Sequence, residues 1–157
     1  MGGLSNKTAV FCRPDDLLAW LAVALLVLGP LFSGCGRSPA EAVAWEFFHA
    51  LRRQDTETAL RLYRPTPSSA AVRPPDRVPA DLQTTASLLS RLEIRDLRVA
   101  QRSFRRATPA DRARGDGDTY WIGLEFAVRL GRDLWQPRLF TVGVQDVNGQ
   151  WAVTDWR

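Results

Sequence analysis

Residues 120–130 read YWIGLEFAVRL, and this stretch decides the fold class. Every second residue is apolar, which in a strand places all the apolar side chains on one face. Trp121 falls on the opposite face. Further strands are predicted from the same kind of pattern at residues 94–104, 134–147 and 150–157. Asn148 and Gly149 predict a tight hairpin turn before the last strand, so the four strands should form an antiparallel meander.

Three helices are predicted ahead of this sheet. Ser38 followed by Pro39 and Glu41 is a capping-box pattern and starts the first helix. Asp55 and Asp81 are expected to cap the second and third helices. Helices segregated from an antiparallel sheet indicate an α+β fold, with the helices on the concave face of a curved sheet.

Two segments are predicted to be loops. Residues 64–80 contain five prolines, which argues against a regular helix there. Residues 105–118 are polar and contain glycine, and they connect the first two strands. The chain as a whole shows no second domain boundary and no internal repeat.

The N-terminal segment predicts export. Leu17–Phe32 is uncharged and shorter than the roughly 20 residues that span a bilayer, so it fits the apolar region of a signal peptide. Residues 31–36 read LFSGCG and resemble the lipobox of bacterial lipoproteins, in which a cysteine after small residues receives lipid. The resemblance implies a signal peptide over residues 1–34 and a lipidated tether over 35–39. It also implies a palmitate-type lipid on Cys35 that holds the chain on the extracytoplasmic face of the cell membrane.

Cys12 would be lost with the signal peptide, so the mature chain would contain no internal disulfide. The alternative is a bitopic protein with an uncleaved membrane helix that begins at Leu17. The net charge is +4 in both cases, because the signal peptide contains equal numbers of basic and acidic residues.

The domain predicted over residues 40–157 resembles the nuclear-transport-factor-2-like superfamily. Two stretches carry the resemblance: AVAWEFFHALRRQDTETALRLY at residues 42–63, and NGQWAVTDWR at residues 148–157. It implies three N-terminal helices on a curved four-stranded antiparallel sheet, in a cone-shaped fold with a cavity between the two layers.

The aromatic residues expected to line such a cavity are Phe47, Tyr63, Tyr120 and Trp151. Enzymes of the superfamily place an Asp or His in this cavity. His49 lies one turn after Glu46 but toward the margin of the apolar stripe, and Asp155 lies in a strand. No catalytic set, metal-ligand spacing or cofactor motif is therefore assigned.

A group of arginines flanks the loop after the first strand: Arg102, Arg105, Arg106, Arg112 and Arg114. We expect these arginines to be exposed to solvent, or to contact anionic headgroups or wall polymers. Contact with nucleic acid is not expected in an exported protein.

Three functions stay open from the sequence. We expect a non-enzymatic module of the cell envelope that binds a small apolar ligand or assembles with an envelope protein. The alternatives are a bitopic component of a secretion or conjugation apparatus, and an enzyme of the isomerase or dehydratase kind. The sequence does not indicate an oligomeric state.

Overall fold

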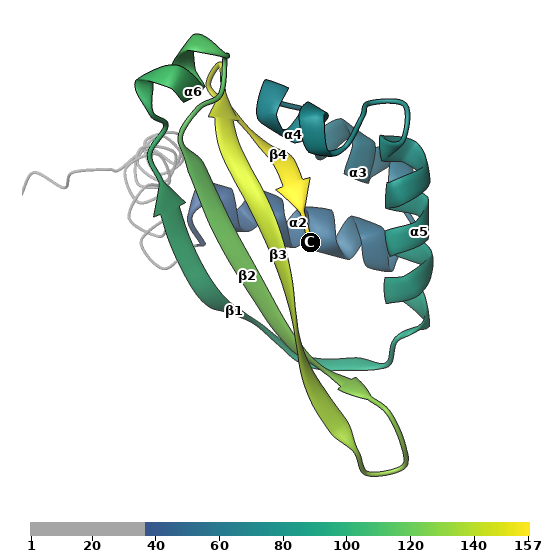
Figure 1. The fold of residues 1–157 in the computed structure, drawn as a ribbon. Helices are drawn as coiled ribbons and strands as arrows, with labels where there is room; N and C mark the ends of the chain where they lie inside the picture. Colours follow the sequence, from purple (N-terminus) through teal and green to yellow (C-terminus); the bar gives the residue numbers. More distant parts are fainter. Residues whose placement is uncertain (1–36) are drawn as a thin grey trace, which may run out of the picture. The chain divides into compact units, whose positions relative to one another are not determined.

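Helices cover one face of a single sheet in residues 37–157, the part of the chain that the computed structural model describes (Figure 1). This part forms one compact unit. Its elements in chain order are α2 (Pro39–Arg52), α3 (Thr56–Leu62), α4 (Pro67–Val72), α5 (Val78–Arg91), β1 (Ile94–Arg105), α6 (Pro109–Ala113), β2 (Thr119–Arg129), β3 (Trp135–Val147) and β4 (Gln150–Trp156).

The sheet has the predicted topology. Its strands lie in the order β1-β2-β3-β4, and each pair is antiparallel. Asn148 and Gly149 have φ angles of 57° and 81°, as the predicted hairpin turn between β3 and β4 requires. The alternation in β2 also holds, because Ile122, Leu124 and Phe126 are buried in the core. The α+β class and the antiparallel meander are therefore confirmed.

Helix α2 lies across the buried face of the sheet and packs on β2, β3 and β4 (Figure 1). Its residues Phe47, Phe48 and Leu51 are fully buried. Phe48 packs between Phe126 of β2 and Phe140 of β3, with ring centroids 5.4 Å apart in both pairs. Helix α5 packs mainly on α2 and α3, and its Thr85 hydroxyl accepts a hydrogen bond from the Trp156 indole of β4 at 3.4 Å. The core is thus a filled interface between the first helix and the sheet.

Two of the three predicted helix caps are present. The Ser38 side chain accepts a hydrogen bond from the Glu41 amide, and the Asp55 carboxylate accepts one from the Thr58 amide. The third prediction was wrong, because α5 begins at Val78, before Asp81, and its N-terminal residue makes no side-chain cap.

The predicted arrangement of three N-terminal helices on the sheet, as in a nuclear-transport-factor-2-like fold, is contradicted. Residues 37–157 contain five helices, and α6 lies between β1 and β2 rather than before the sheet. Helix α4 forms inside the segment that was predicted to be a proline loop. Pro67 and Pro109 stand in the first turns of α4 and α6, where a missing N–H is harmless and the fixed φ is already helical.

The face of the sheet away from the helices carries Trp121, as predicted. A Cβ atom built on Gly143 would lie 3.0 Å from the Trp121 ring, so the indole lies flat over the glycine of the neighbouring strand. The guanidinium of Arg157 lies 4.6 Å from the centre of the same ring. At one end of this face the Trp121 ring lines a pocket together with residues of α4 and α6.

Residues 37–157 contain no helix that is long and apolar enough to span a membrane. Cys35 and the predicted signal peptide over residues 1–34 lie outside the described residues.

Candidate functional site

Two short helices with the same start meet at one end of the sheet. Helix α4 begins Thr66-Pro67 and α6 begins Thr108-Pro109, and in each the threonine hydroxyl accepts a hydrogen bond from the amide three residues later. The residue at that position, Ser69 or Asp111, bonds back to the threonine amide. Both helices therefore start in a complete capping box.

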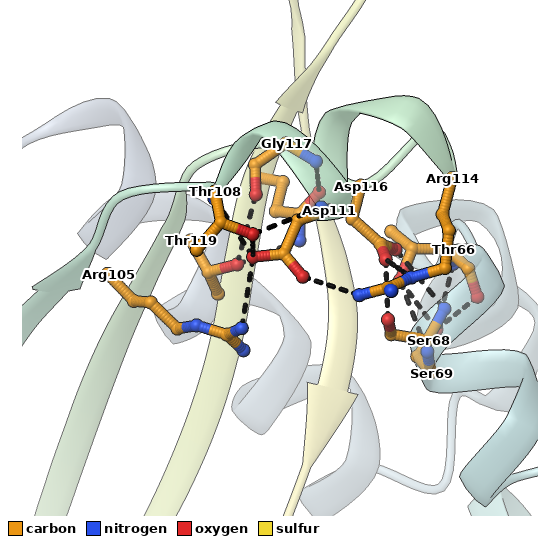
Figure 2. A network of polar contacts seen from close by, with 11 residues as sticks. Thr66, Ser68, Ser69, Arg105, Thr108, Asp111, Arg114, Asp116, Gly117 and Thr119 are labelled. Carbon is orange, nitrogen blue, oxygen red and sulfur yellow. Dashed lines mark hydrogen bonds and ion pairs between the residues drawn. The ribbon is translucent and has the colours of Figure 1, made fainter.

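A pocket of about 180 Å³ lies between these helix starts and the ends of β2, β3 and β4 (Figure 2). Most of its lining residues carry a polar side chain. The residues are Thr66, Ser68, Ser69, Val72, Arg105, Ala107, Asp111, Asp116, Gly117, Thr119, Trp121, Gln145, Thr154 and Asp155.

Asp111 is a buried carboxylate on α6 with partners on three sides (Figure 2). It accepts hydrogen bonds from the Thr108 amide and hydroxyl, at 2.9 and 2.8 Å. Arg105 and Arg114 donate to it at 3.1 and 2.6 Å. The Thr108 hydrogen bonds, and then the two guanidinium charges, lower the pKa of Asp111.

Asp116 lies in the loop after α6 and links this loop to α4. Its carboxylate accepts hydrogen bonds from the Ser68 amide at 3.2 Å and from the Ser68 hydroxyl. Burial raises the pKa of Asp116, but the hydrogen bonds from Ser68 outweigh it and the pKa is lowered. Asp116 therefore stays charged at neutral pH and holds two segments that are far apart in the sequence.

A neutral chain of hydrogen bonds completes the floor of the pocket. The Gln145 amide nitrogen donates to the Thr119 hydroxyl at 2.8 Å, and the Gln145 carbonyl oxygen accepts from the Gly117 amide at 3.2 Å. Gln145 and Thr119 are buried and are paired across β3 and β2. This chain fixes the loop after α6 to the sheet.

The groups in the pocket bind one another. Both carboxylates have a lowered pKa and are held by arginine or hydroxyl donors, so neither is a base whose pKa is matched to neutral pH. Within residues 37–157 no group of three or more His, Cys, Asp or Glu side chains is placed to hold a metal ion. The pocket is chemically suited to fixing the fold, and to binding a small polar group.

His49 and Asp155 lie in different surroundings. His49 packs against Trp45 and Phe48, and burial lowers its pKa, with help from nearby arginine charges. Asp155 lines the polar pocket but forms an ion pair with Arg73, with Nη1 and Oδ1 2.8 Å apart. His49 thus lies against aromatic residues of α2, whereas Asp155 lies at the pocket and is paired with an arginine.

The four predicted cavity-lining aromatics are divided between two environments. Phe47 and Tyr63 are buried in the core, and both rings pack on Trp156, with centroids 5.5 and 5.4 Å away. The Tyr63 hydroxyl is buried and has no hydrogen-bond partner among the described residues. Tyr120 and Trp151 contact each other near the surface, with ring centroids 5.3 Å apart.

Trp151 lines an open groove of about 780 Å³ between the helices and the β3–β4 hairpin. Val43 of α2, together with Arg61 and Arg64, forms the other wall. This groove is separate from the polar pocket in Figure 2, since the two share no lining residue.

Most of the arginine group around α6 is engaged in ion pairs. Arg102 binds Glu41, Arg105 and Arg114 bind Asp111, and Arg112 lies 3.6 Å from Asp118. Their side chains are 55–65% exposed, as expected for solvated arginines, and they also neutralise acidic groups of the fold.

Sequence reasoning missed Asp111 and Asp116, the two carboxylates at the centre of the site. One signal was present. Residues 66–69 read TPSS and residues 108–111 read TPAD, and both have the spacing of a helix start with Pro at the first position.

No family model matches the chain, and no curated protein matches it. Among solved structures, the chain is similar to the solution structure of a SEC-C motif-containing protein from Rhodopseudomonas palustris. The sequences are 16% identical, the match covers 85% of this chain and 90% of the other, and the TM-score is 0.47. A likeness at this level carries no argument about function.

Proposed function

We propose that the chain is a lipid-anchored module of the cell envelope that assembles with a protein partner and is not an enzyme. In this proposal residues 1–34 are a signal peptide, and Cys35 carries the lipid on the extracytoplasmic face of the cell membrane. The observation that carries the proposal is the position of Cys35, after an apolar segment and three residues before Ser38, the N-cap of α2.

The packing of the described domain favours assembly with a protein partner, rather than binding of a small apolar ligand in a cavity between the helices and the sheet. Phe47, Phe48 and Leu124 are completely buried between α2 and the sheet, so side chains fill that interface. The polar pocket supports a non-catalytic role, because its carboxylates are charged and are held by internal donors. Trp121 lines the polar pocket together with residues of α4 and α6. On the same face of the sheet, Ser103, Gly123 and Thr141 line a second hollow that contains no helical residue and is available to a partner.

Metabolic labelling with a fatty-acid analogue in a bacterial host tests the anchor. The wild-type chain should take up label, and Cys35→Ala should take up none and keep its signal peptide. Cys12→Ala is the matched control and should be labelled like the wild type, because it removes the other cysteine in the chain. An unlabelled wild type, or equal label in Cys35→Ala, contradicts the proposal. An unlabelled chain with an intact N-terminus in the membrane fraction would favour the bitopic alternative.

A further inference from the structure

Three aromatic side chains form a row on the helix side of the sheet. Phe104 and Tyr120 have ring centroids 4.8 Å apart, and Tyr120 and Trp151 have centroids 5.3 Å apart. Phe104 is 53% exposed and Tyr120 is 37% exposed. Tyr120 pairs with the core residue Val144, so this aromatic row faces the same side as the core and extends beyond it. Neighbouring exposed aromatics are candidates for a surface that contacts a protein or a membrane.

The aromatic row lies beside the start of α2. Arg102, two residues before Phe104 on β1, faces the same side and binds Glu41 in the first turn of α2, with Nε and Oε1 2.5 Å apart. Val43 in the next turn lines the same groove as Trp151. The row therefore flanks the end of the helix that follows the proposed lipid anchor.

The length of chain before α2 limits how far this end can lie from a membrane. Cys35 stands three residues before Ser38. A fully extended chain spans at most ~3.6 Å per residue, so the two Cα atoms are at most about 11 Å apart. A lipid on Cys35 would thus keep the start of α2 close to the headgroups. Trp and Tyr side chains are enriched at this level of membranes.

The charge beside the aromatic row is complementary to an anionic surface. Arg61 and Arg64 line the groove with Trp151, are exposed, and form no ion pair within residues 37–157. Of the neighbouring acids, Glu41 is already paired with Arg102. Asp146, opposite Trp151, is exposed and accepts a hydrogen bond from the Gly149 amide at 2.7 Å, which does not neutralise it. It offsets one of the two arginine charges and leaves the group positive. Free arginines next to exposed aromatics match the two contacts that an anionic bilayer offers.

We propose that the aromatic row, with Arg61 and Arg64, is the surface on which the domain rests on an anionic lipid bilayer. The rings lie at the level of the headgroups and the two guanidinium groups bind lipid phosphates. This proposal rests on the anchor at Cys35, and it adds the orientation of the domain and the chemistry of the surface it contacts.

The test uses the full-length chain with Cys12→Ala and one introduced cysteine. Phe104→Cys reports on the aromatic row. Ser103→Cys is the matched control, because Ser103 is exposed on the same strand but pairs with Trp121 on the opposite face of the sheet. Each variant is labelled with a thiol-reactive, environment-sensitive fluorophore and reconstituted into bilayers of phosphatidylethanolamine and phosphatidylglycerol with brominated acyl chains.

Bromine should quench the fluorophore at position 104 at least about threefold more than the one at position 103. Added Arg61→Gln and Arg64→Gln should lower quenching at 104, as should replacement of phosphatidylglycerol by phosphatidylcholine. Equal quenching at the two positions, or stronger quenching at 103, would overturn the proposal. Quenching at 104 that is independent of both arginines and of lipid charge would show a purely apolar contact and would also overturn it.

The number of fluorophores bound per chain distinguishes failure of the bilayer-surface proposal from failure of the anchor proposal. A lipidated Cys35 is blocked, so each variant should take one fluorophore, whereas an unlipidated Cys35 adds a second. In the second case, Cys35→Ala is introduced and the same bilayers are used. Selective quenching at position 104 would then support the bilayer-contacting surface although the anchor proposal has failed. Loss of that quenching would overturn both the surface proposal and the anchor proposal.

Discussion

Glu41 in the first turn of α2 accepts two hydrogen bonds from the guanidinium group of Arg102 on β1, at 2.5 and 3.3 Å. The Glu41 side chain is 9% exposed and that of Arg102 is 61% exposed. The pair fixes the start of the first helix to an edge strand 61 residues later in the chain. The hydrogen bond from Arg102 lowers the pKa of Glu41, although burial opposes it.

Glu41→Gln should lower the free energy of unfolding by about 1 kcal/mol, because a charge-assisted pair with one exposed partner is partly screened. Since the folded pKa of Glu41 lies below its usual 4.5, this stability is present above pH 4.5 and is lost as the pH falls through the folded pKa. Denaturant titrations at pH 7 and pH 3 measure it. Glu46→Gln, at an exposed position of the same helix, is the control; an equal loss there would contradict a specific role for the pair.

His49 should titrate below pH 6.5. Burial is the first cause of its lowered pKa, followed by the charges of nearby arginines. The unfolded chain therefore binds more protons between the folded pKa and pH 6.5, and stability should fall as the pH drops through that window. The chain has one histidine, so an NMR titration of its imidazole in detergent gives one unambiguous curve. A pKa at or above 6.5 would contradict the buried position.

Asp116→Asn should loosen α4 more than the sheet. The carboxylate holds the Ser68 amide and hydroxyl, and loss of its charge should cost about 1.5 kcal/mol. Hydrogen exchange should become faster in α4 while the amides of β2 and β3 keep their protection. Asp76→Asn is the control, because Asp76 is exposed and forms no ion pair within residues 37–157. Equal exchange in the two variants would show that Asp116 does not hold α4.

Gly123→Ala should destabilise the sheet. A Cβ at Gly123 would lie 2.9 Å from the Gln101 Cβ and 3.1 Å from Leu139 Cδ1, so β1 and β2 must shift. We expect a net cost of about 1 kcal/mol after the gain in backbone entropy. Gly131→Ala is the control, since its nearest neighbour is 3.9 Å away. Thermal unfolding compares the two. A Gly123→Ala variant as stable as Gly131→Ala would mean that the strands adjust without strain.

The strands could be predicted from the sequence because their signal is local. Alternation in residues 120–130 depends on one strand having one buried face, and Asn148-Gly149 supplies the positive φ angles of a hairpin by itself. The caps at Ser38 and Asp55 could be predicted for the same reason, since donor and acceptor are three residues apart.

The prolines show where local reasoning was incomplete. A proline breaks the interior of a helix but favours its first turn, and composition alone does not distinguish the two positions. The segment of α4 was therefore predicted to be a loop, and that of α6 was predicted to be one because it is polar and contains glycine. The pocket between the two helices was missed.

The sequence by itself determined the α+β class, the order of the strands, and two helix starts, because each follows from contacts between residues close in the chain. Only the tertiary structure decided which side chains meet across long separations. Asp116 meets Ser68 48 residues earlier, and the Gln54 side chain, in the turn after α2, donates a hydrogen bond to Ser90 of α5. It also decided that Phe47 lies in the core while Tyr120 lies at the surface. The sequence does not distinguish the two residues, because both are aromatic and both lie in a strong local apolar pattern. Burial depends on which element covers each ring, and α2 begins too late to cover the end of the sheet where Tyr120 lies.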